Sequence, residues 1–262
     1  MRALNTAATG MMAQELKVEV IANNIANMST TGYKRQRAEF QDILYEHVRR
    51  IGTQTSTQGN ILPVGVDIGS GVKTVGTPRI ITQGTLTQTG GQLDLAIQGD
   101  GYFKIQLPDG TFAYTRDGSF QMDAQGRIVT AQGNVVQPGI TIPANSSALT
   151  INSQGQVSVI VQGSTNPTTL GQLTLTSFIN EPGLLPIGDN LLTETPASGP
   201  PTDGLAAVNG LGSIQQGNLE NSNVEPVTEI TDLITAQRAY EMNSKVITAA
   251  DQMLQTTSGL YH

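Results

Sequence analysis

Apolar residues recur every seven positions at both ends of the chain, while the long stretch between them shows short runs of alternating residues. The amino-terminal set is Leu4, Met11, Val18 and Ile25, with Ala7, Ile21 and Met28 three residues after Leu4, Val18 and Ile25. The carboxyl-terminal set is Leu233, Tyr240, Ile247 and Leu254, with Ala236 and Ala250 interleaved. Heptad spacing is typical of helices that bury a narrow apolar seam against a partner helix. We therefore predict a first helix over residues 4–27 and a closing helix with Pro226 in its first turn.

Neither helix is expected to be stable alone. Burying the four heptad residues of the first seam gains about 6–12 kcal/mol, at about 1.5–3 kcal/mol each. Ordering about 25 backbone residues costs about 1–2 kcal/mol each before hydrogen bonds are counted. The two seams are therefore expected to dock on each other or on neighbouring copies of the chain.

The middle of the chain carries turn signals at short intervals. Asp-Gly or Gln-Gly pairs at 100, 109, 117, 125 and 132 alternate with strand-like runs such as Phe103, Ile105 and Leu107. Such turns favour antiparallel hairpins. The predicted fold class is α+β and multi-domain: terminal helices form a coiled-coil-like domain, and antiparallel hairpins form a β-rich central domain.

This pattern predicts four parts. They are an amino-terminal helical segment (1–44), an extended linker (45–70), a β-rich outer domain (71–217) and a carboxyl-terminal helix that pairs with the amino-terminal segment (218–262). The Pro- and Gly-rich stretch 196–217 is expected to be the return linker.

Composition narrows the function classes. The formal net charge is −7, and residues 51–220 hold 5 basic and 11 acidic residues, which argues against nucleic acid as a partner. The absence of cysteine excludes disulfides and thiolate chemistry. The amino end lacks the continuous apolar segment of a cleaved signal peptide. The sequence contains no run of 18 apolar residues, so we expect no membrane insertion. We expect a cytoplasmic protein or one exported without signal cleavage.

Candidate chemistry is sparse, and we expect no catalytic, cofactor or metal site. His47 and His262 have no second His or Cys with which to bind zinc. Asp100, Asp109 and Asp117 directly precede glycines, where aspartate commonly forms turns. We therefore favour a structural role in turns over calcium binding or acid/base catalysis. The basic run 34–37 is expected to be a solvated or subunit-facing patch.

Three asparagines near the end of the first helix, Asn23, Asn24 and Asn27, are poor helix formers. One interpretation is fraying toward the helix end. The other is burial of the helix flanks against other helices, where side-chain amides hydrogen-bond sideways and fix the register. The sequence favours neither.

Several strings resemble one known family. Ala22-Asn23-Asn24-Ile25-Ala26-Asn27 with Thr31-Gly32-Tyr33-Lys34, and Gln237-Arg238-Ala239-Tyr240-Glu241-Met242-Asn243, are similar to the terminal signatures of bacterial flagellar rod and hook proteins. Leu95 to Phe103 and Tyr114 to Phe120 resemble the start of the β-domain in that family. Chain length and an extra segment over 45–63 resemble its distal rod members.

The resemblance implies a structural subunit that polymerises helically into a rigid drive shaft and transmits torque to the hook. It implies type III export without a cleaved signal, a place in the rod that crosses the periplasm, and no enzyme activity. The implied partners are other copies, proximal rod proteins, hook protein, the P-ring and L-ring proteins, the export apparatus and a rod cap.

The resemblance and the seams together give two sets of candidate residues. The expected assembly interface comprises Leu4, Met11, Val18, Ile21, Asn23, Asn24, Ile25, Asn27, Leu233, Gln237, Arg238, Tyr240, Ile247 and Leu254. The expected rod-stiffening linker includes Tyr45, Arg49, Arg50, Gln54 and Pro63.

Alternatives remain at this point. A hook or proximal rod protein of the same family fits most of the strings. A secreted β-rich adhesin or phage-tube-like protein with coiled-coil ends predicts a closed trimer instead of an open helix. A carbohydrate-active enzyme would require a working carboxylate pair among the Asp-Gly turns.

Overall fold

The computed structural model describes residues 2–49, 64–162 and 166–259, and it divides the chain into two compact units. The helical unit comprises the described parts of 1–25, 36–78 and 225–262. The β unit comprises the described parts of 26–35 and 79–224. Each unit is therefore assembled from separate stretches of chain, and the fold is α+β.

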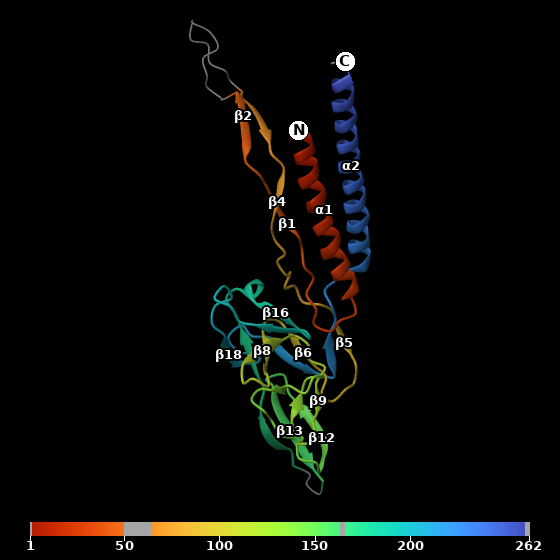
Figure 1. Ribbon diagram of the computed structural model, residues 1–262. Helices are drawn as coiled ribbons and strands as arrows, with labels where there is room; N and C mark the ends of the chain where they lie inside the picture. The colour runs from red at the N-terminus through yellow and green to blue at the C-terminus, as the bar shows by residue number, and fades with distance from the viewer. Residues whose placement is uncertain (1, 50–63, 163–165, 260–262) are drawn as a thin grey trace. The chain divides into compact units, whose positions relative to one another are not determined.

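Two long helices dominate the helical unit, α1 (Arg2–Ala26) and α2 (Pro226–Gly259). They run side by side (Figure 1) and in opposite directions, because Gly10 of α1 faces Asn243 while Asn24 bonds to Glu229. Both predicted helices are confirmed, including the start of the second at Pro226. No helix among the described residues is long and apolar enough to span a membrane.

The most buried stripe of α2 contains the two alanines interleaved in the predicted seam, and the larger seam residues lie beside it. Glu229, Ala236 and Ala250 are buried, whereas Tyr240 is 44% exposed. On α1 the most buried side chains are Ala7, Ala13, Val20, Ile21 and Asn24. The heptad residues of both helices thus border the contact and leave part of their surface open.

A narrow two-stranded ribbon completes the helical unit and runs beside α1 (Figure 1). Strand β1 (Glu39–Asp42) pairs with β4 (Val72–Gly76), and β2 (Tyr45–Arg49) pairs with β3 (Val66–Gly69), both antiparallel. The Oγ1 of Thr9 accepts a hydrogen bond from the backbone N of Val72 at 3.3 Å, which attaches the ribbon to α1. All five residues of β2 are exposed.

The β unit is built from antiparallel sheets. The largest is nine-stranded; its main path runs β16-β17-β8-β7-β11-β10-β9, and β15 joins β7 to β18. These strands are β7 (Tyr102–Gln106), β8 (Phe112–Thr115), β9 (Gln121–Met122), β10 (Ile128–Val129), β11 (Val135–Val136), β15 (Thr174–Ser177), β16 (Leu185–Gly188), β17 (Leu191–Thr193) and β18 (Thr202–Leu205).

Smaller sheets surround it. Strands β12 (Ser146–Ile151), β13 (Gln156–Val161) and β14 (Thr168–Gln172) form a three-stranded meander. Two pairs join strands from the beginning and the end of the β unit, which are distant in sequence. Strand β6 (Leu95–Gln98) pairs with β19 (Ser213–Gln216), and β5 (Leu86–Gln88) pairs with β20 (Asn218–Glu220). A 3-10 turn covers Glu181–Gly183.

Three of the five predicted hairpin turns connect paired strands: the turns at 109, 125 and 132 join β7 to β8, β9 to β10 and β10 to β11. The turns at 100 and 117 do not form hairpins, because β6 pairs with β19 and β8 pairs with β7 and β17. Gly110 has φ +83°, and the carboxylate of Asp109 accepts hydrogen bonds from the backbone N of Thr111 at 2.9 Å and from its hydroxyl at 2.6 Å. These bonds lower the pKa of Asp109. Asp109 is thus a turn former, as its position before a glycine predicted.

One apolar core holds the β unit together. It contains 18 buried residues, among them Leu95, Phe103, Ile105, Val157 and Leu175. A smaller cluster of Tyr102, Tyr114, Phe178 and Leu184 packs with its aromatic rings edge to face. All of these residues come from 93–214, so the core does not include either end of the unit.

The expectation that 196–217 forms a linker is wrong. This stretch supplies β18 to the nine-stranded sheet and β19 as the partner of β6. The glycines that suggested a linker serve close packing and turns. A Cβ on Gly212 would lie 2.5 Å from the carbonyl oxygen of Gln98, and Gly210 has φ +84°.

Candidate assembly surfaces and a polar clasp

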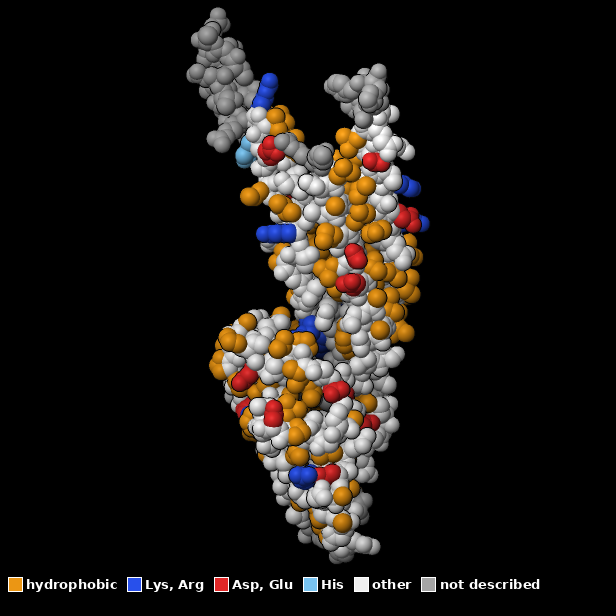
Figure 2. Space-filling model, in the orientation of Figure 1, with side chains coloured by type: hydrophobic (Ala, Val, Ile, Leu, Met, Phe, Trp, Pro, Cys, Tyr) orange, Lys and Arg blue, Asp and Glu red, His pale blue; other side chains and the backbone are white. Residues whose placement is uncertain are grey.

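An open groove lies between the two helices of the helical unit. It measures about 510 Å³ and is lined by Glu15, Val18, Glu19, Gln237, Tyr240 and Glu241. Figure 2 shows hydrophobic side chains along the visible face of the helices with carboxylates among them. Val18 and Tyr240, one from each predicted seam, contribute its apolar surface, so the groove presents both seams to solvent.

The structure brings the predicted assembly residues onto this helix pair with different degrees of burial. Ile21 and Asn24 are buried. Residues of intermediate burial are Leu4, Met11, Val18, Ile25, Asn27, Leu233 and Ile247. Exposed residues are Asn23, Gln237, Arg238, Tyr240 and Leu254.

Asn24 is the polar centre of the contact between α1 and α2. Its Nδ2 donates to Oε2 of Glu229 at 3.1 Å and to the backbone O of Gln36 at 2.9 Å. Its Oδ1 accepts from the backbone N of Gln36 at 2.9 Å. Burial with these partners matches the interpretation of flank burial for Asn24; fraying does not account for it.

The ribbon exposes apolar side chains along its length. Leu44 is 85% exposed, and Tyr45, Val48, Val66 and Ile68 are also exposed. Tyr45 and Arg49 lie in β2. The other three predicted linker residues, Arg50, Gln54 and Pro63, lie outside the described residues. A two-stranded ribbon with this much exposed apolar surface is marginally stable in water by itself.

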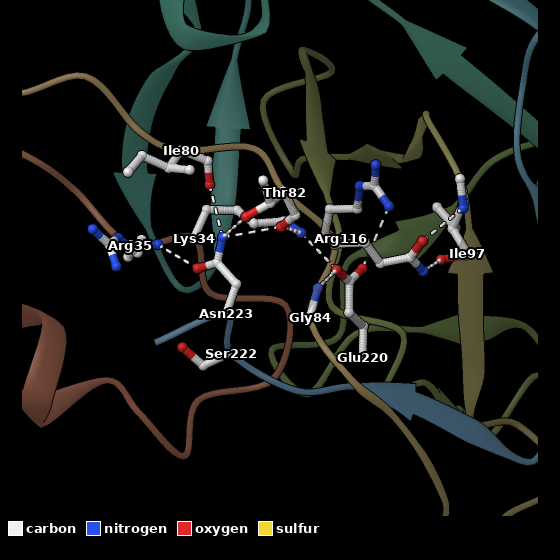
Figure 3. Close-up of polar contacts among 12 residues, drawn as sticks. Lys34, Arg35, Ile80, Thr82, Gly84, Ile97, Arg116, Glu220, Ser222 and Asn223 are labelled. Carbon is white, nitrogen blue, oxygen red and sulfur yellow. Dashed lines mark hydrogen bonds and ion pairs between the residues drawn. The ribbon is translucent and has the colours of Figure 1, made fainter. Parts of the chain in front are cut away.

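The β unit contains a buried ion cluster that joins its two ends (Figure 3). Nζ of Lys34 lies 2.5 Å from Oε1 of Glu220, and the second oxygen of Glu220 lies 3.4 Å from a guanidinium nitrogen of Arg116. The side chain of Glu220 has no exposed surface, and Lys34 also donates to the backbone O of Thr82 at 3.0 Å. Burial lowers the pKa of Lys34, and the Glu220 carboxylate opposes this effect.

Arg116 links the ion cluster to the aromatic cluster. Its guanidinium carbon lies 5.3 Å from the ring centre of Tyr102, within the range of a cation–π contact. The phenol of Tyr102 donates to Glu181 at 2.9 Å. Burial, first of all, and the charge of Glu181 raise the pKa of Tyr102. Two cations thus share the buried carboxylate of Glu220, and a second carboxylate lies nearby.

Asn223 ties three stretches of chain together (Figure 3). Its Oδ1 accepts from the backbone N of Arg35 at 2.7 Å, and its Nδ2 donates to the backbone O of Ile80 at 2.8 Å and of Thr82 at 3.0 Å. The backbone N of Ile80 in turn donates to the O of Arg35 at 2.9 Å. The side-chain amide of Asn223 and this backbone bond therefore hold the three stretches together.

Gly32 allows the chain to lie flat on the β unit. Its backbone N donates to the O of Glu220 at 2.8 Å, and its φ is +68°. A Cβ at this position would lie 2.8 Å from the backbone C of Arg116 and the N of Asp117. We call residues 26–35 the strap, and we call the strap, Arg116 and residues 80–84 and 220–223 the polar clasp.

The expectation that Lys34 is solvated or subunit-facing is wrong, because its side chain is buried against Glu220. The sequence interpretation also missed Glu220 and Asn223. The available signal was the polar run Glu220 to Asn223 directly before the closing helix. Among the described residues, no group of three His, Cys, Asp or Glu side chains forms a metal site.

Comparison with known proteins identifies the family to which the chain is similar. Three family profiles match the chain: "Flagella basal body rod protein" over residues 4–34, "Flagellar hook protein FlgE/F/G D1 domain" over 96–159, and "Flagellar basal body rod FlgEFG protein C-terminal" over 215–260. The first covers most of α1 and most of the strap, and the third covers β20, Asn223 and α2.

Relatives that match over nearly their full length indicate the branch of the family to which the chain is most similar. The flagellar basal-body rod protein FlgG of Caulobacter vibrioides is 58% identical over 99% of both chains. FlgG of Agrobacterium fabrum is 52% identical over 98% of both chains. The rod protein FlgF of Caulobacter vibrioides is 37% identical over 94% of this chain and 91% of its own.

The chain belongs to the family of flagellar rod and hook proteins. Within that family it groups with the FlgG proteins of the distal rod, and it is a structural subunit of the rod in the flagellar basal body.

Proposed function

We propose that this subunit polymerises helically into the rigid drive shaft of the distal rod and transmits torque from motor to hook. The observation that carries the proposal is the groove between α1 and α2, where Val18 and Tyr240 leave apolar surface open to solvent. Burial of such seams by a second copy gains about 25 cal/mol per Å² of apolar area. The inner layer of the rod is then a coiled-coil-like array of helices from many copies.

The ribbon is proposed as the brace that makes the shaft rigid. Its exposed apolar residues, including Tyr45 and Val48, support a contact with neighbouring copies, since an isolated ribbon gains little from its own pairing. Each contact is small, but it recurs in every copy along the shaft. We include Arg49, Arg50, Gln54 and Pro63 in this role on the basis of the sequence.

The remaining assignments follow from membership in the family. We propose export through the flagellar type III apparatus without a cleaved signal, and assembly under a rod cap. The proposed neighbours are proximal rod proteins, hook protein and the P-ring and L-ring proteins. We assign no catalysis, cofactor or metal to the chain. The helical unit is proposed as the inner domain and the β unit as the outer one.

Substitution within the groove tests polymerisation. Val18→Asp is expected to abolish rod assembly, seen by electron microscopy of basal bodies, while the monomer keeps its helical circular dichroism because residue 18 is not buried. Gln154→Asp, on an exposed turn of the β unit, is the matched control and should assemble normally. Normal rods from Val18→Asp would contradict the proposal.

Removing residues 45–63 tests the brace. The shortened chain is expected to form a curved polymer, because the repeated contact between ribbons would be lost. Curvature is measured from micrographs of the isolated polymer against the full-length chain. A straight, equally stiff polymer would show that the ribbon has no such role.

A further inference from the structure

The polar clasp is separate from the apolar core of the β unit. No residue of the strap, of 80–84 or of 220–223 contributes to either apolar cluster of the described residues. Strand β20 pairs with β5 in a two-stranded sheet, outside the nine-stranded one. The clasp is therefore attached by polar contacts, whereas the core is held by apolar burial.

Two contacts of the strap converge on one residue, Glu220. Glu220 bonds through its side chain to Lys34 at 2.5 Å and to the backbone N of Gly84 at 2.9 Å, and through its backbone O to Gly32 at 2.8 Å. Without Lys34, the carboxylate keeps only the longer contact to Arg116 as an ion pair. Loss of one partner from a buried ion pair leaves an uncompensated charge. The strap is thus held or released largely as one unit.

The strap itself is suited to water when released. Residues 29–32 are Ser, Thr, Thr and Gly. Lys34 is the one residue of the strap whose exposed fraction is below a tenth. Elements that are fastened by polar contacts and bury little apolar area are the ones that open below the global unfolding free energy.

We propose that the strap is a releasable lock, latched by Lys34 and Glu220, that opens from the β unit while the apolar core stays folded. The strap leads from α1 and residues 220–223 lead into α2, so release frees both connections at once. On the proposed function, this lets the two helices dock on a second copy during addition to the rod without unfolding the β unit.

Native-state hydrogen exchange of the full-length monomer tests the lock. Amides of the clasp (Gly32, Arg35 and Gly84) are expected to exchange together, faster than the core amides of Ile142 and Leu173 and with a weaker dependence on denaturant. Lys34→Met should speed exchange at the clasp roughly tenfold or more, while the core amides should still exchange more slowly than the clasp and with the stronger dependence on denaturant.

Lys104→Met is the matched control, because Lys104 pairs with the half-exposed Asp203 on the surface of the same unit. It should leave exchange at the clasp unchanged. The proposal is overturned if wild-type clasp amides exchange at the rate and denaturant dependence of the core, a result that needs no variant to fold. Because the measurement uses the monomer, it can fail while rod assembly is normal, and the two proposals are thus judged separately.

Discussion

The carboxylate of Glu220 lies 2.5 Å from the ammonium group of Lys34, although 186 residues separate them in the sequence. The pair closes the β unit at the point where the amino-terminal segment meets the strand that returns toward the carboxyl-terminal helix. Both side chains are almost fully buried, which makes the pair a test of how charge contributes to this fold.

Glu220→Gln should destabilise the β unit strongly. The substitution leaves the cations of Lys34 and Arg116 buried without their anion, and breaking a buried pair in this way costs about 3–5 kcal/mol. Urea unfolding followed by circular dichroism measures the change. Asp203→Asn removes the anion of a more exposed pair and should cost less than about 1 kcal/mol. Equal losses for the two variants would contradict the importance of burial.

Gly32→Ala should lower the melting temperature more than Gly110→Ala. Both glycines have positive φ, at +68° and +83°, so both variants carry backbone strain of about 1–2 kcal/mol. A Cβ at Gly110 meets open space, whereas at Gly32 it meets the backbone of Arg116 and Asp117. The difference between the two melting temperatures isolates the clash. If it is zero, the strap does not lie as closely on the β unit as described.

Alkaline pH should destabilise the β unit through its tyrosines. Burial, with smaller contributions from Glu194 and Asp203, raises the pKa of Tyr114 from 10.0 to about 12. A raised folded-state pKa gives stability that is complete below pH 10 and is lost as pH rises from 10 through 12. Free energies of unfolding measured across this range should fall.

The contribution of Tyr114 is isolated by Tyr114→Phe, which should make the decline with pH shallower. Lys34 acts in the opposite direction, because its pKa is lowered, but it is present in both proteins and cancels in the comparison. An unchanged slope in the Phe variant would show that residue 114 does not titrate abnormally.

Asn24→Ala should destabilise the helical unit while leaving the β unit intact. The variant removes three hydrogen bonds and leaves Glu229 buried without this donor, at a cost of about 1–3 kcal/mol. Loss of helical signal on heating measures the effect. Asn23→Ala changes the neighbouring, exposed residue and should have a smaller effect. Identical melting curves for the two would contradict the central place of Asn24.

The sequence revealed what is local. Heptad spacing located both helices to within a few residues, since the period is a direct consequence of helix geometry. Asp109 and Gly110 revealed their turn because the required backbone conformation selects these residue types. Membership in the family was visible in the terminal strings.

The clasp was not predictable in the same way. Lys34 in a polar stretch is usually solvated, and nothing near it in the sequence shows that Glu220 will neutralise it. Asn223 bonds to backbone atoms of Arg35, Ile80 and Thr82, and such bonds leave no pattern of residue types. The glycines of 196–217 suggested a linker because close packing and turns both select glycine.

The two contacts between α1 and α2 are separated by the same number of residues on each helix. From Gly10 to Asn24 is 14 residues, and from Asn243 back to Glu229 is also 14, two heptads on each helix. A slip by one heptad would place the amide of Asn24 against the methyl group of Ala236 and leave Glu229 without it. The polar pair thus selects one register among several that the apolar seam alone would accept. A subunit that repeats along a shaft needs a single helix register. A shift of one heptad displaces one helix by about 10 Å along the other, and each copy that docks on a misaligned subunit would meet the displaced surface.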